Sequence, residues 1–317
     1  MAQIVATGSG RLTMEDLAGA AARHRRESAM RGLFFAAAFL SILMSAAIVA
    51  SLAGGTVDFL SEVELGSLWS AGWVPRRNMF DVKTIVVGTL VVSITAMLVA
   101  TPVGLGAALY LAEYASPRRR RFLKPILETL ASVPSVVMAF FALRIITPQI
   151  VQRLFGQDVP IFNKLGAGLA VGLLVTPLVA SVAEDAMYAV PRSLREASFG
   201  LGAHRRTTSV RVVMPAAVSG IVAALILGIS RAIGETMIVA IAAGGTGGSF
   251  FDTSYDPLQG GQTMTAAITS LATGSDQVRG TGPTYPSLFF VGLLLFFFTL
   301  TLNLVSERFV RRVRRRY

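Results

Sequence analysis

The chain contains no cysteine and only two histidines among its 317 residues. The absence of cysteine excludes disulfides and thiolate metal sites. His24 and His204 lie far apart in the sequence, so a histidine-rich metal centre is not expected either. The sequence also lacks a G-x-x-x-x-G-K-[ST] phosphate loop, a nucleophile elbow and an H-E-x-x-H motif. We therefore predict that the chain is not an enzyme, and that any uphill work draws on an ion gradient or on another subunit.

Charged residues are scarce as well. They make up 15% of the chain, against about a quarter of a soluble domain, while 53% of the residues are hydrophobic. The apolar residues form six blocks, and each is long enough to cross a hydrocarbon core of about 30 Å as a helix. Prolines inside three blocks are tolerated where neighbouring helices satisfy the freed backbone groups. The predicted fold class is an all-α integral membrane protein with six transmembrane helices, at Leu33–Ala53, Thr84–Leu111, Leu123–Ile146, Leu165–Val190, Val213–Ala243 and Leu288–Val305.

The placement of the basic residues predicts the orientation of these helices. The formal net charge of +11 comes from Lys and Arg that flank the apolar blocks, a pattern of membrane topology rather than of nucleic-acid binding. With the N-terminus inside, 21 Lys and Arg fall in inner segments and six in outer ones. Both termini are therefore predicted to be cytoplasmic. The predicted domains are a cytoplasmic arm at 1–32, a transmembrane domain at 33–306 and a basic tail at 307–317.

Two polar segments have predictions of their own. The arm is not a cleavable signal peptide, because a long polar stretch precedes an apolar block that is itself long enough to span. Thr13 and Asp16 would cap a short helix that lies on the anionic inner leaflet. The last outer segment, from Gly244 to Pro286, holds an apolar stretch at Met264–Leu271 that is too short to span. It is either a helix at the outer mouth or a loop that packs on a partner.

The segment between the fourth and fifth blocks carries the most specific motif. Its residues include Arg195-Glu196-Ala197-Ser198, then Gly202, then Val212-Val213-Met214-Pro215. This resembles the coupling loop of ABC importer permeases: Glu-Ala-Ala, three residues, Gly, nine residues, Ile-x-Leu-Pro. The resemblance implies that residues 191–215 are the coupling loop, with Glu196, Ala197, Ser198, Gly202 and Pro215 in the motif. The short helix within it, from Glu196 to Phe199, would dock on an ATPase subunit. Gly202 would permit a sharp turn, and Pro215 would sit in the first turn of the next helix. The plain alternative is an amphipathic connector.

Three further stretches narrow the family: Ala108–Ala115, Leu127–Val137 and Ser230–Val239. They resemble phosphate importer permeases, and the Gly-Glu-Thr-Met ending resembles the PstC-type subunit more than its PstA-type sister. The resemblance implies a permease that opens a pathway by alternating access in a bacterial or archaeal cytoplasmic membrane. It also implies a homologous PstA-type permease, a PstB-type ATPase dimer, a PstS-type binding protein outside the membrane, surrounding membrane lipid and no nucleic acid. This chain would bind no cofactor, since ATP and Mg are used by the partner ATPase.

Other functions stay open at this point. Sulfate or molybdate importer permeases share parts of the same motifs. A gradient-driven secondary transporter or a channel would explain the spans and the buried charges but not the coupling loop.

Two arginines fall inside predicted spans and mark a candidate pathway. Arg231 and Glu235 are four residues apart, which on a continuous helix puts both on one face about one turn apart. A guanidinium suits phosphate because its planar fork donates two parallel hydrogen bonds. Glu235 would hold the arginine in the absence of substrate and favour a protonated phosphate; the alternative is a purely structural ion pair. Arg144 is either a second anion contact at the outer mouth or a side chain that snorkels to the interface. Glu128, Glu184 and Asp185 are interpreted as charges that anchor inner loops.

Overall fold

The computed structural model describes residues 21–69, 72–245, 255–273 and 282–314. Helices make up their regular secondary structure apart from one short hairpin and an isolated bridge between Gly244 and Gly261. The chain divides into two compact units, 1–51 and 52–317. In the first unit, helix α2 (Ala21–Glu62) begins at residue 21 and continues into the second unit. Its described side chains from 26 to 48 are all exposed. The predicted first span lies inside α2, and the helix passes residue 32 without a break. The arm helix predicted at Thr13 and Asp16 lies outside the described residues.

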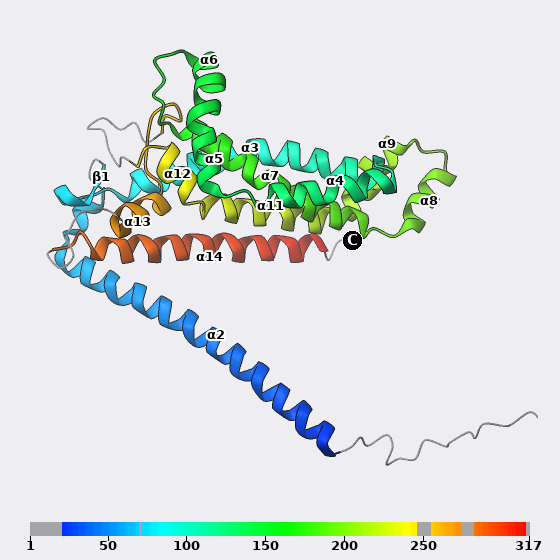
Figure 1. Cartoon of the computed structure of the whole chain (residues 1–317), viewed down its shortest axis with the longest axis horizontal. Helices are drawn as coiled ribbons and strands as arrows, with labels where there is room; N and C mark the ends of the chain where they lie inside the picture. Colours follow the sequence, from blue (N-terminus) through cyan, green and yellow to red (C-terminus); the bar gives the residue numbers. More distant parts are fainter. Residues whose placement is uncertain (1–20, 70–71, 246–254, 274–281, 315–317) are drawn as a thin grey trace, which may run out of the picture. The chain divides into compact units, whose positions relative to one another are not determined.

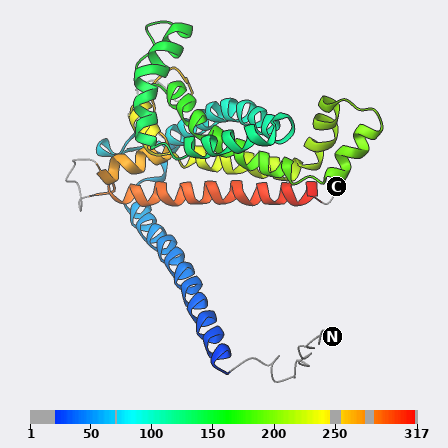
Figure 2. The same cartoon turned by 45° about the vertical axis from the view of Figure 1, so that its right-hand side comes forward.

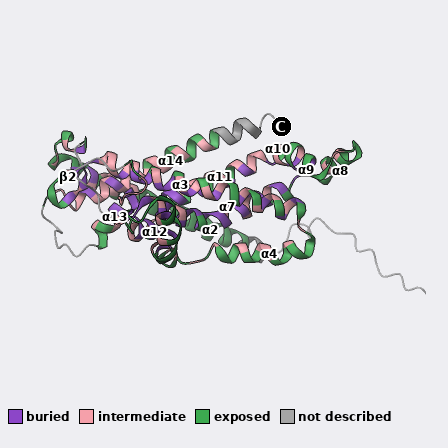
Figure 3. Cartoon of the chain, turned by 90° about the horizontal axis from the view of Figure 1, so that it is seen from above, coloured by how far each residue is buried: buried purple, intermediate pink, exposed green. Residues whose placement is uncertain are grey.

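The centre of the second unit is a bundle of helices α3 (Val82–Leu109), α7 (Lys164–Tyr188) and α11 (Val218–Ile233). Figure 1 shows them side by side with α14 (Pro286–Arg314), and Figure 3 shows that α7 is the most buried of them. Glycines allow the close approach of α7 to α3. A Cβ added at Gly172 would lie 2.8 Å from the carbonyl oxygen of Ala96. Small residues at such contacts are typical of membrane bundles, where packing rather than the hydrophobic effect holds helices together.

A second apolar cluster covers the outer end of the bundle. It is built on η1 (Leu65–Trp69), η2 (Pro75–Arg77) and the hairpin of β1 (Trp73–Val74) with β2 (Met79–Phe80), in which Trp73 pairs with Phe80 in register. The Trp73 ring packs edge-on against Phe80, with centroids 5.9 Å apart. Phe59, Met264 and Val291 join the cluster from three other helices. The loop after the first span is therefore a folded cap on the bundle.

The predicted third span is wrong in its bounds. The π-helical turn η3 (Tyr110–Tyr114) is followed by the basic helix α4 (Pro117–Leu130). Helix α4 ends at Leu130, and the chain turns at 131–134. Pro134 starts a new helix because it has no N–H to continue the old one and favours an extended residue before it. The apolar helix is then α5 (Ser135–Phe141), π-helical η4 (Ala142–Val151) and α6 (Gln152–Phe155). In Figures 1 and 2 this helix runs across the direction of α14.

The predicted fifth span is divided as well. The helix formed by α9 (Arg205–Thr208), η5 (Ser209–Val213) and α10 (Met214–Ala216) is bent by 72° from α11. Helix α11 ends at Ile233, and the short helices α12 (Met237–Ala242) and α13 (Met264–Thr273) follow. Five described helices are long and apolar enough to cross a membrane, and counting the bent pair as one span gives six.

Candidate translocation and coupling sites

The structure separates the two residues expected to share one helix face. Arg231 lies in the last turn of α11, but Gly234 ends that helix and Glu235 stands in the break before α12. No ion pair joins the two side chains among the described residues. The expected one-turn spacing of Arg231 and Glu235 is therefore wrong. The physical reason is that the spacing rule holds only along an unbroken helix.

Helix α11 has two different faces. Ala224, Gly228 and Ala232 are buried, and Gly228 packs against Val179 and Val175 of α7. Ala223, Leu227 and Arg231 follow one another at intervals of four residues and are all exposed. Residues with this spacing lie on one helix face. Arg231 is thus presented on an open face of the chain rather than turned into its core.

Glu235 has a local partner instead of an arginine. Its carboxylate accepts a hydrogen bond of 3.4 Å from the Ile238 N–H at the start of α12. Its main-chain carbonyl accepts one of 2.8 Å from the hydroxyl of Thr265 in α13. The N–H of Met264 in turn donates to the Thr89 hydroxyl of α3 at 3.0 Å. The apolar stretch of the last outer segment is therefore a helix, which was one of the two sequence predictions. It packs within this chain, beside the break between α11 and α12.

Arg144 lies on η4 and is exposed. It forms no ion pair in the part of the chain that the structure describes. Helix α5, which leads into η4, packs against α12. The elements that carry Arg144 and Arg231 are thus linked through α12, although the two side chains make no recorded contact with each other.

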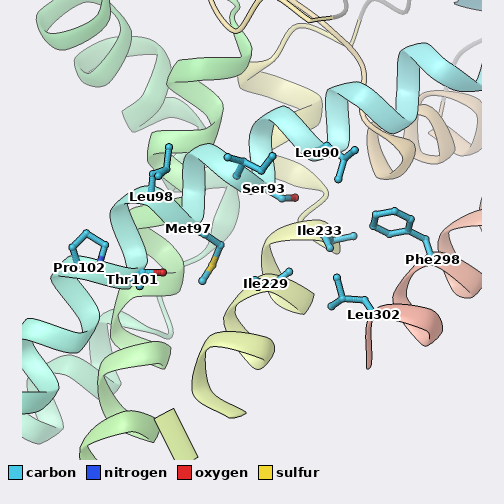
Figure 4. A pocket seen from close by; sticks show the side chains of 11 residues that line it. Leu90, Ser93, Met97, Leu98, Thr101, Pro102, Ile229, Ile233, Phe298 and Leu302 are labelled. Carbon is cyan, nitrogen blue, oxygen red and sulfur yellow. The ribbon is translucent and has the colours of Figure 1, made fainter. Parts of the chain in front are cut away.

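An apolar cavity of about 540 Å³ lies between α3, α11 and α14 (Figure 4). Ser93 and Thr101 are the only hydroxyl side chains on its described lining, and Ile229 and Ile233 border it from α11. Burying an anion against such a wall would cost its hydration without replacing it. Arg231 lies two residues from each of these isoleucines and so projects to about the opposite side of α11. This cavity is therefore not the candidate anion site.

The coupling loop contains α8 (Arg192–Gly200), a turn at 201–204 and then α9. Glu196 and Ala197 are exposed, and the apolar side chains of Phe199 and Leu201 are exposed with them. The Ser198 hydroxyl lies 2.9 Å from that of Thr208, which ties α8 to α9. The predicted short helix is present, and its outward face is free to meet another surface.

The two turn-forming residues of the motif have different outcomes. Gly202 adopts a φ of +79°, in the left-handed region that the predicted sharp turn requires. Pro215 was predicted to lie in the first turn of the fifth span, and it does not. It lies in the last turn of the helix Arg205–Ala216, just before the 72° bend. The hydrogen bond that proline cannot make would run back to the carbonyl of Arg211, and the π-helical turn η5 lies there.

A buried ion pair fastens this loop to the bundle, and the sequence analysis missed it. Arg195 donates from Nε and Nη2 to Oε1 of Glu113 at 3.1 and 2.9 Å. It also donates to the carbonyl oxygens of Val190 and Met187 at the end of α7. The two partners are 82 residues apart. The only hint in the sequence was that Glu113 is a carboxylate at the end of an apolar block, on the predicted inner side where arginines are abundant.

The acidic residues at the inner end of α7 anchor α4, as predicted for Glu184 and Asp185. Glu184 is fully buried and accepts from Arg120 at 2.6 Å and from Lys124 at 2.8 Å. Lys124 also pairs with Asp185. Burial lowers the pKa of Lys124, but its hydrogen bonds to Asp185 and Glu184 outweigh this effect and raise the pKa above its ordinary value. Glu128 is exposed and makes no ion pair among the described residues, so it does not share this role.

Residues 100–317 match the protein family described as binding-protein-dependent transport system inner membrane component. The chain belongs to this family of ABC importer permeases. It is a multi-pass subunit of the inner membrane, and such subunits have no ATPase site of their own. The prediction that the chain is an ABC importer permease is therefore confirmed.

Curated relatives cover most of this permease. The phosphate transport system permease protein PstC of Pasteurella multocida is 29% identical over 302 residues, which cover 89% of this chain and 90% of that one. PstC 1 of Mycobacterium tuberculosis is 32% identical over 260 residues, with 76% of this chain and 75% of that one covered. Among solved structures, a bacterial ABC transporter involved in alginate import matches 92% of this chain and 99% of its own, with a TM-score of 0.60 at 15% identity. The structural likeness confirms the permease fold.

Replacing Gly202 of the permease with alanine is expected to slow transport by about fivefold. A Cβ meets no atom within 4 Å at this position, so the effect comes from backbone strain alone. A left-handed conformation costs a non-glycine residue about 1–2 kcal/mol, and about 1 kcal/mol corresponds to that factor. The measurement is the ATP-driven uptake rate of the complete importer. Gly200→Ala is the matched control, since it also meets open space but has no positive φ; equal slowing by both variants would contradict the explanation.

Proposed function

We propose that this permease forms part of the pathway of an inorganic phosphate importer, with Arg231 as the principal contact for the anion. The observation that carries the proposal is an arginine inside a predicted membrane span that is exposed on one face of α11 and forms no ion pair with any described residue. An isolated charge inside a membrane span is costly unless it faces a polar pathway or a partner. The relatives named PstC support phosphate as the anion.

The chemistry of the site fits a dianion that stops only briefly. A guanidinium presents a planar fork to two phosphate oxygens. Arg231 forms no ion pair with the described residues, and Glu235 is engaged with the start of α12 instead. One strong positive charge gives moderate affinity, which a transport site needs so that the anion leaves when the pathway opens to the other side. Arg144 is proposed as a second contact.

The coupling loop indicates how the other subunits of the importer would contact this chain. We propose that the exposed face of α8, around Glu196, Ala197 and Phe199, docks on a PstB-type ATPase subunit. A PstA-type permease would supply the other wall of the pathway opposite α11, and a PstS-type protein would deliver phosphate from outside. Closure of the ATPase pair would then move α8 and, through it, the inner ends of α3 and α7.

The experiment that tests the substrate is uptake of labelled phosphate by vesicles that contain the complete importer with its binding protein. We expect uptake that requires ATP and is competed by unlabelled phosphate but not by equal concentrations of sulfate or molybdate. Uptake of labelled sulfate or molybdate in place of phosphate would reject phosphate and keep the permease. Phosphate uptake that continued without the ATPase subunits would instead reject the ATP-driven mechanism.

A further inference from the structure

A second cavity lies at the inner end of the bundle, and no described residue of α11 lines it. Its volume is about 490 Å³, and it lies between α4, the turn η3 that follows α3, and the last turn of α7. Its lining differs from that of the apolar cavity in Figure 4, because four charged side chains of α4 border it. These are Arg120, Arg121, Lys124 and Glu128.

Three cations converge on this cavity, and two are held in place. Arg120 and Lys124 are positioned by Glu184, and the Arg120 guanidinium also stacks on the Tyr188 ring at 3.8 Å. Arg120 uses Nε and Nη2 on the carboxylate, which leaves the two N–H groups of Nη1 for another acceptor. Arg121 makes no ion pair within the described part of the chain. The cavity therefore offers donors to an anion.

The adjacent face of α4 is apolar and uncovered. Phe122, Ile126 and Leu130 recur every four residues, and they are 70%, 41% and 50% exposed. Helix α4 thus has a basic face and an open apolar face, and it lies at the ends of membrane spans, among tyrosines and arginines. Such a helix is typical of the membrane interface. An occupant that satisfies both faces needs an anionic group joined to long apolar chains.

We propose that this cavity binds the phosphodiester headgroup of an anionic phospholipid from the cytoplasmic leaflet. Arg121 is its main ligand, Arg120 and Lys124 assist, and the acyl chains lie along Phe122, Ile126 and Leu130. Basic pockets between membrane helices on the cytoplasmic side suit such headgroups. A soluble anion would use the cations but leave the apolar face bare. Glu128 lines the same cavity and opposes the anion, which sets the direction of one test.

The test counts phosphatidylglycerol molecules retained by the complete, detergent-purified importer in native mass spectrometry as the lipid is titrated. We expect Arg121→Gln to weaken binding by about fivefold, since one basic residue near an anionic surface contributes about 1 kcal/mol. Arg118→Gln is the matched control, because Arg118 is exposed on the same helix but does not line the cavity. Glu128→Gln is expected to strengthen binding. Phosphatidylcholine should not replace phosphatidylglycerol.

Three outcomes would overturn the proposal. Equal losses in Arg121→Gln and Arg118→Gln would show a general charge effect rather than a site. Equal competition by water-soluble glycerophosphoglycerol would show a site for soluble anions. The third concerns protein cover: because the chain has no cysteine, Ala115→Cys places a single thiol of this chain in the cavity lining. Cross-linking of that thiol to an ATPase or sister permease subunit in the complete importer would assign the cavity to a protein interface.

Discussion

Arg231→Met is expected to abolish ATP-driven phosphate uptake while the importer still assembles. Methionine fills the volume of the arginine stem but removes the two donors of the fork. A hydrogen bond to a charged group contributes about 1.5–3 kcal/mol, so the loss of two lowers uptake at low phosphate by about a hundredfold or more. Folding should not suffer, because Arg231 is exposed and has no ion pair to lose within the part of the chain that the structure describes. The measurement is the initial uptake rate against phosphate concentration.

Control variants distinguish the effect of losing the Arg231 charge from the effect of any change on the exposed face of α11. Leu227→Met changes an exposed residue one turn away on the same face and should leave uptake near the wild-type rate. Arg231→Lys keeps the charge but loses the planar fork, so an intermediate rate is expected. Arg144→Met should cause a smaller loss if Arg144 is a second contact, and none if it only snorkels. Wild-type uptake by Arg231→Met would make Arg231 a structural residue and remove the main support for the proposed site.

The sequence predicted those features that depend on local chemistry. Apolar blocks indicate membrane helices because the bilayer requires internally bonded backbone, and four of the six predicted spans each lie along one helix long enough to cross a membrane. The coupling helix and the Gly202 turn were predicted from a motif whose residues lie within one short segment. Composition and motif spacing were sufficient for the fold class and for the family.

Breaks within apolar blocks could not be predicted from hydropathy. Leu123–Ile146 and Val213–Ala243 each read as one continuous span, yet the chain turns at 131–134, bends next to Pro215 and opens at Gly234. Tertiary contacts stabilise these interruptions, such as the hydrogen bond from Thr265 to the Glu235 carbonyl. The expected pairing of Arg231 with Glu235 failed for this reason. The pairing of Glu113 with Arg195 was missed for the related reason that its partners are 82 residues apart.

The Glu113–Arg195 pair is expected to transmit the motion of α8 to the bundle. Its side chains are only 5% and 17% exposed, so the pair is well shielded from water. Arg195 ties the coupling helix to η3, which follows α3, and to the carbonyls of Met187 in the last turn of α7 and of Val190 just after it. We therefore expect Arg195→Met to leave ATP hydrolysis by the assembled importer while phosphate uptake falls about tenfold or more, the factor that corresponds to about 1.4 kcal/mol. The measurement is the ratio of phosphate imported to ATP hydrolysed.

A matched variant and a double variant decide between transmission and simple loss of stability. Arg192→Met removes the same side chain type from an exposed position of α8 and should keep the ratio unchanged. Arg195→Met alone leaves Glu113 buried without its cation, which typically costs about 3–5 kcal/mol. The double variant Glu113→Met with Arg195→Met removes that cost and should regain thermal stability. If the regained stability also restored uptake, the pair would be only a fastening. If uptake stayed low in a stable importer that still hydrolysed ATP, the pair would be needed to transmit the motion of the ATPase from α8 to α3.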